Sequence, residues 1–200
     1  MEERSVWKWA KVRYWLETEK SDEHVLKALK LNGKNEAAMK LEHNYKYYEY
    51  FAKKSLDYRL NGWLRSKTTT WDAWKKLLLQ NKVTERGQLK DIADTSEFSI
   101  YVRYVNEYDN YMHTTLINSY SIPHLPIPRG ASDAELYARV KIMAIAQRED
   151  AFAKVMLGLT DTVKRRRVTL KGNALMQHED YKWYQLFGEL KAAEAAATHT

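Results

Sequence analysis

The chain repeats an ordered set of tryptophan, leucine and tyrosine residues, and this repetition constrains its fold more than any other feature. The set opens with Trp15-Leu16, continues with Ser21 and closes with Leu29 and Leu31. It returns 48 positions later (63 minus 15) as Trp63-Leu64, Thr69, Leu77 and Leu79. Repeats of this length bury their apolar faces against their own helices and against their neighbours. The sequence therefore predicts an elongated, modular array.

An aromatic segment follows each copy of this set, and a third, altered copy occupies the end of the chain. Tyr45, Tyr48 and Phe51 are spaced at three residues, which places them on one side of a helix. The same spacing recurs in Phe98, Tyr101 and Tyr104, and again in Tyr181, Tyr184 and Phe187. In the third copy Leu157 and Leu159 match the earlier leucine pair, whereas Met143-Ala144 replace Trp-Leu.

Helix signals indicate an all-α fold. Only 7 Gly and 3 Pro interrupt 200 residues, so long helices with short turns are favoured over many short strands. Apolar spacing predicts a helix from Val6 to Leu16, and Ser21 is a typical N-cap for the next one. Further helices are expected over Lys34–Leu41 and from Tyr45 to about Leu60.

The positions of glycine and proline along the sequence predict three units. The first covers residues 1–61, the second 62–118 and the degenerate third 132–200, with a Pro-rich linker loop at 119–131. Ser132 and Glu135 have the form of a capping box, so the first helix of the third unit is expected to begin near Asp133.

The residue inventory gives no indication of catalysis. Without Cys the chain has no disulfide, thiol nucleophile or Cys-based zinc site, and its six His residues show no metal-ligand spacing. Phosphate-binding glycine loops and the serine nucleophile elbow are also absent. We therefore expect a non-enzymatic protein without cofactor or metal. No apolar run approaches the length of a transmembrane segment.

One dense basic run, Lys164, Arg165, Arg166 and Arg167, stands out against a net charge of +7. Such runs act as nuclear-import signals or nucleic-acid patches, and they also occur simply as solvated helix faces or loops. A basic helical nucleic-acid binder is thus the alternative function for this chain, although nucleic acid is the less favoured partner.

The Trp-Leu pair, the hydroxyl residue six positions on, the Leu-x-Leu and the tyrosine-rich helix together resemble the WY domain. That domain occurs in the RXLR effectors that oomycetes such as Phytophthora deliver into plant cells. The match departs from the family pattern in two ways. The third unit lacks the Trp, and Phe51 and Phe187 stand where the family usually has Tyr. By resemblance, the WY-type core comprises Trp15, Leu16, Val25, Leu29, Leu31, Tyr45, Tyr48, Phe51, Trp63, Leu64, Leu77, Leu79, Phe98, Tyr101, Tyr104, Leu157, Leu159, Tyr181, Tyr184 and Phe187.

The resemblance implies a secreted pathogen effector that acts in the host cytoplasm or nucleus and binds host plant proteins to suppress immunity. The signal and translocation segments would lie upstream of these residues. Some tandem-unit members recruit a host phosphatase scaffold subunit, which makes such a subunit one candidate partner. Because binding residues lie on exposed faces and loops, the first candidates for partner contact are Trp7, Leu125 and Ile127.

Overall fold

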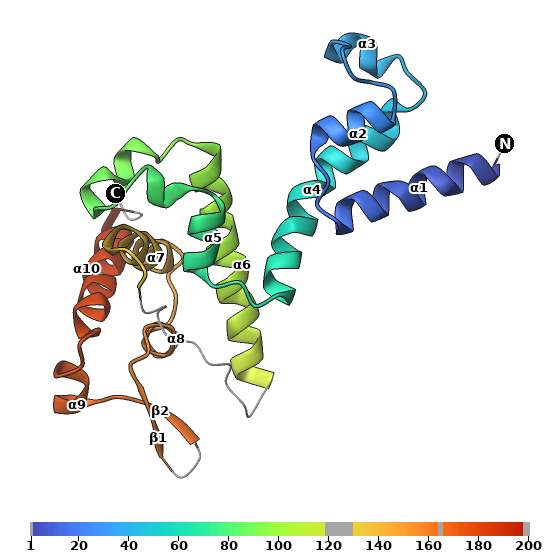
Figure 1. The fold of residues 1–200 in the computed structure, drawn as a ribbon. Helices are drawn as coiled ribbons and strands as arrows, with labels where there is room; N and C mark the ends of the chain where they lie inside the picture. Colours follow the sequence, from blue (N-terminus) through green and yellow to red (C-terminus); the bar gives the residue numbers. More distant parts are fainter. Residues whose placement is uncertain (1, 119–129, 164–165, 198–200) are drawn as a thin grey trace. The chain divides into compact units, whose positions relative to one another are not determined.

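A computed structural model describes residues 2–118, 130–163 and 166–197, with the backbone alone for residues 2–4, 162–163 and 166–167. The chain forms two compact units, residues 1–67 and residues 68–200. Within the described residues the fold is helical apart from one short hairpin, which confirms the predicted all-α class (Figure 1).

The first compact unit is built from α1 (Glu2–Glu17), α2 (Asp22–Ala28), α3 (Glu36–Lys40) and α4 (Tyr45–Arg65). Ser21 caps α2 as predicted, because its Oγ accepts a hydrogen bond from the amide of His24 at 3.2 Å. The helix α1 packs along α4. Their shared core with α2 consists of Val12, Trp15, Leu16, Val25, Leu29, Leu31, Tyr47 and Phe51.

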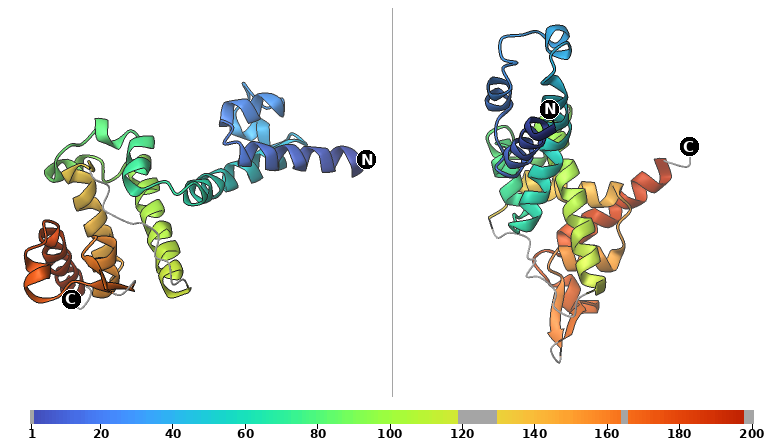
Figure 2. Two further views of the ribbon diagram at one scale, coloured as in Figure 1. Left: turned by 60° about the horizontal axis from the view of Figure 1, so that its bottom comes forward. Right: turned by 90° about the vertical axis from the view of Figure 1, so that its right-hand side faces the viewer.

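The second compact unit begins with α5 (Thr70–Lys76), two 3-10 turns η1 (Leu79–Asn81) and η2 (Arg86–Asp91), and the long α6 (Ser96–Asn118). It continues with α7 (Asp133–Ile145), α8 (Asp150–Met156), a hairpin, α9 (Gly172–Met176) and α10 (Tyr181–Ala197). The cap at Ser132 starts α7 at the predicted residue. Helix α7 lies between α6 and α10, and it also packs on η2 and α5 (Figure 2).

The backbone repeats three times, even where the third copy has lost its Trp. Helices α2, α5 and α8 are each seven residues long and start 48 and 128 positions apart (70 minus 22, 150 minus 22). A left-handed residue precedes each of these helices and another follows it. Because positive φ is uncommon outside Gly, this recurrence supports an internal repeat, and its assignment to the WY type stays a prediction. These residues are Glu19, Lys67 and Gln147 before the helices, and Lys30, Leu78 and Gly158 after them.

Two details differ from the sequence prediction. Helix α4 was expected to end near Leu60 and instead continues through Gly62 to Arg65, so the predicted boundary between residues 61 and 62 falls inside a helix. One glycine weakens a helix by only about 1 kcal/mol, and the buried Leu60 and Trp63 on either side hold the segment helical. The three-unit division stays a prediction.

The second difference is an antiparallel hairpin between α8 and α9. Strand β1 (Thr160–Val163) pairs with β2 (Arg166–Thr169), with Thr160 opposite Thr169. The β-branched Thr and Val residues in both strands favour extended backbone. Arg166 and Arg167 therefore lie in a strand, and the interpretation of the basic run as a helix face is wrong at these positions.

Candidate functional site

The outward face of α1 is apolar, and the described residues of the first compact unit leave it exposed. Val6, Trp7 and Tyr14 are 66%, 71% and 57% exposed, while Val12 and Trp15 on the opposite side are buried. The neighbouring Trp9 differs, because its ring packs edge-on against Tyr47 at 4.8 Å. Large aromatic side chains rarely stand so exposed in series without a partner. We call Val6, Trp7, Ala10 and Tyr14 the α1 face; the structure thus places the candidate Trp7 on an open surface.

The equivalent face of α7 is buried. Residues 128 positions after Val6, Trp7, Ala10 and Tyr14 are Ala134, Glu135, Ala138 and Ile142, and each of them is at most 5% exposed. They are covered because α7 packs on η2, α5 and α6. The same position in the repeat is therefore a helix-packing surface in the second compact unit and an open surface in the first.

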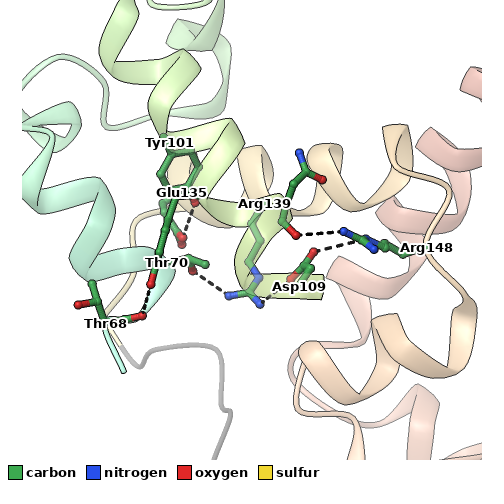
Figure 3. Close-up of polar contacts among 9 residues, drawn as sticks. Thr68, Thr70, Tyr101, Asp109, Glu135, Arg139 and Arg148 are labelled. Atoms are coloured by element: carbon green, nitrogen blue, oxygen red, sulfur yellow. Dashed lines mark hydrogen bonds and ion pairs between the residues drawn. The ribbon is translucent and has the colours of Figure 1, made fainter. Parts of the chain in front are cut away.

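A charged network lies buried where α7 meets α5 and α6 (Figure 3). The Tyr101 hydroxyl donates to Glu135 Oε1 at 2.7 Å, and Arg139 Nη1 donates to Thr70 Oγ1 at 2.7 Å. Arg139 Nη2 also lies 3.7 Å from Asp109 Oδ1. Glu135 has the sequence position of a capping-box residue, yet its carboxylate is drawn into this network instead.

Burial dominates the electrostatics of this network. It raises the pKa of the Asp109 carboxyl to about 6, against the opposing attraction of Arg139 and Arg148. The pKa of Glu135 is raised as well, first by burial. Within the described residues neither Asp109 oxygen accepts a hydrogen bond, which explains why the two guanidinium groups do not offset its desolvation.

The raised pKa of Asp109 predicts a specific pH dependence of stability. A carboxyl whose folded pKa exceeds its unfolded value binds protons more tightly when folded, so its stabilisation is present below about pH 4 and is lost as pH rises through about 6. A shift of about two units corresponds to about 3 kcal/mol. We expect the free energy of unfolding of Asp109→Asn to vary less with pH between 4 and 6 than that of the parent chain. The free energy of unfolding of both proteins is measured by urea unfolding at several pH values. An equal change with pH in the two proteins would contradict this assignment.

The structure places the residues of the predicted WY-type core at different depths. Fourteen of them are buried: Trp15, Leu16, Val25, Leu29, Leu31, Phe51, Trp63, Leu77, Leu79, Tyr101, Tyr104, Leu157, Leu159 and Phe187. Six are half-buried: Tyr45, Tyr48, Leu64, Phe98, Tyr181 and Tyr184. Five buried aromatic residues were not in the predicted set, namely Tyr47, Trp74, Tyr108, Phe152 and Trp183.

Other predicted positions fall outside the described residues. These are Leu125 and Ile127 of the Pro-rich loop, together with Lys164 and Arg165 of the basic run. In the part of the chain that the structure describes, no group of three or more His, Asp or Glu is arranged to hold a metal ion. No helix in that part is long and apolar enough to cross a bilayer.

Comparison with known proteins identifies relatives among oomycete effectors. The sequence is 29% identical over 154 residues to a secreted RxLR effector protein of Phytophthora infestans, covering 77% of this chain and 64% of that protein. The chain is related to the RXLR effectors. The same sequence is also 26% identical over 148 residues to the RxLR effector protein Avr1 of the same organism, again covering 64% of the relative. No family model matches the sequence, and no solved structure matches it significantly.

Proposed function

We propose that this protein is a secreted oomycete effector that acts inside plant cells by binding host proteins, without catalysis of its own, and thereby suppresses immunity. Its relatives are named as RxLR effectors. The α1 face is the observation that carries the proposal for binding, since its counterpart on α7 is a helix-packing surface. A helical surface of a host protein is the partner that such a face fits.

Trp7 is the residue expected to contribute most to this contact. Tryptophan is enriched among interface residues whose loss costs 2 kcal/mol or more, so Trp7→Glu should weaken binding by at least about thirtyfold. The measurement is recovery of host proteins from plant extract on the full chain, with or without the substitution. Tyr111→Glu is the matched control, because Tyr111 is also an exposed aromatic residue, 48% exposed, on a different helix.

The outcomes separate the leading function from its alternative. A host protein that is recovered by the parent chain and by Tyr111→Glu, but not by Trp7→Glu, supports binding through the α1 face. Recovery that is equal for all three proteins contradicts it. If the recovered material is nucleic acid and binding falls steeply with salt, the alternative function is favoured.

A further inference from the structure

The repeat contains a polar site between the start of its seven-residue helix and the long helix that follows. In each copy a backbone carbonyl precedes the helix, and a polar side chain stands two residues later. The carbonyls belong to Lys20, Thr68 and Arg148, and the side chains to Asp22, Thr70 and Asp150. We call this arrangement the cap site, and its three copies differ in what fills them.

In the third copy a lysine of the same unit fills the cap site. Lys191 Nζ donates to the carbonyl of Arg148 at 2.8 Å and to Asp150 Oδ1 at 3.0 Å. The ammonium also lies 5.3 Å from the centre of the Phe187 ring, within the range of a cation–π contact. Its hydrogen bond to Asp150 is the main reason that the pKa of this carboxyl is lowered.

In the second copy the groups that fill the site come from two helices (Figure 3). The Tyr104 hydroxyl donates to the carbonyl of Thr68 at 2.7 Å. The cation is Arg139 of α7, which donates to Thr70 and lies 5.5 Å from the centre of the Tyr108 ring. A cation supplied by another helix can therefore occupy this position of the repeat.

In the first copy the site is hollow. Ser55 stands 136 residues before Lys191, as Phe51 stands 136 before Phe187, and its hydroxyl turns back to donate to the carbonyl of Ala52 at 3.2 Å. No hydrogen bond from the described residues reaches the carbonyl of Lys20. The space measures about 370 Å³ and is lined by Trp15, Leu16, Glu19, Lys20, Ser21, Asp22, Phe51, Ser55 and Arg59.

We propose that this hollow binds a primary ammonium group, presented as a lysine side chain of a bound protein. The ligand ammonium takes the position that the Lys191 ammonium has in the third copy. It donates to the Lys20 carbonyl and the Asp22 carboxylate, and it faces the Phe51 ring. Glu19 supplies a second carboxylate where the third copy has the neutral Gln147. The two carboxylates offset the positive charges of Lys20 and Arg59, which also line the space, and Arg59 is held over the Trp63 ring at 5.7 Å.

A compact ammonium on a flexible stem suits this space better than a planar guanidinium, because the ammonium donates all its hydrogen bonds from a single nitrogen. The inference deepens the proposed function by giving the chemistry of one partner contact, and it rests on that function only for the statement that the ligand belongs to a protein. The site is distinct from the α1 face, whose residues do not line the hollow.

The test uses the full chain and a small probe, Nα-acetyl-lysine-N-methylamide, titrated while backbone amide signals are followed by NMR. We expect saturable shifts at residues 19–23 and 51–55, and none with the same probe acetylated on its side-chain nitrogen. Asp22→Asn should weaken binding at least tenfold. Ser55→Lys should abolish it, because the new side chain fills the hollow from within as Lys191 does.

Ala52→Lys is the matched control for Ser55→Lys, since it adds the same charge at an exposed position on the same helix. It should retain binding within about threefold. Equal shifts with the acetylated probe, no shifts at all, or unchanged binding by Ser55→Lys would each overturn the proposal. Failure here would leave the Trp7-dependent capture of a host protein unaffected, so the two proposals are tested separately.

Discussion

Replacing Trp74 with Ala is expected to lower the free energy of unfolding by about 3–5 kcal/mol, the range typical for removing a buried tryptophan. The side chain is fully buried in α5. Its ring meets Tyr101 edge-on at 4.8 Å between centroids and Phe98 at 6.3 Å. The substitution therefore removes both apolar contact area and two aromatic pairs.

The indole nitrogen of Trp74 has no hydrogen-bond partner among the described residues. A Phe at this position would lose part of the packing but would also remove that unsatisfied donor, so Trp74→Phe should cost clearly less than Trp74→Ala. Denaturant unfolding followed by far-UV circular dichroism on the full chain measures both. An unfolding midpoint that is unchanged in Trp74→Ala would contradict a core role for this residue.

Trp15→Ala and Trp63→Ala provide the comparison within the repeat. Both side chains are buried, with 7% and 6% exposed, and their loss is expected to fall in the same range. Because each keeps a small exposed edge, we expect the loss at Trp74 to be at least as large.

Trp74 shows where repeat matching in the sequence succeeds and where it fails. The positions that recur in the sequence, such as Trp15, Leu29 and Phe51, are buried. Trp74 has no aromatic counterpart, since Leu26 and Lys154 occupy the same place in the other copies. A residue that fills a space present in only one copy leaves no repeated signal.

The tyrosine-rich helices expose a different limit. The segment 45–48 contains three tyrosines, so a spacing of three residues selects Tyr45, Tyr48 and Phe51 just as readily as a spacing of four selects Tyr47 and Phe51. The structure buries Tyr47 and leaves Tyr45 half-buried. The choice of face depends on where α1 packs, and local periodicity carries no information about that.

The candidate site was partly accessible from the sequence. Trp7 was selected as a candidate partner contact on the expectation that binding residues lie on exposed faces, and its side chain is exposed. The hollow at the first cap site was missed, although aligning Tyr45–Phe51 with Tyr181–Phe187 four residues further would have paired Ser55 with Lys191. Such a site is defined by a missing side chain, and its chemistry emerges only when three-dimensional copies are compared.

Arg139→Met is the second substitution with a large expected effect, again about 3–5 kcal/mol. Arg139 is 3% exposed and is the cation nearest to two buried carboxylates, Asp109 and Glu135. Met has a similar length and fills the space, so the loss reports the charge rather than a cavity. Without the guanidinium, burial keeps both carboxylates in a medium that opposes their ionised form.

Removing the three most deeply buried charges together should reverse most of this loss. The triple variant Arg139→Met, Asp109→Leu, Glu135→Gln leaves Arg148, whose side chain is 19% exposed, as the remaining charge of the network. Replacing a buried ion cluster by neutral side chains is often neutral or stabilising. We expect its free energy of unfolding to lie within about 1 kcal/mol of the parent chain, far above that of the single variant. Additive losses in the corresponding mutant cycle would show instead that Arg139 stabilises α7 by packing alone. A large coupling energy would show that the network determines how α7 packs on α5 and α6. Its charges would then stabilise this packing only in combination.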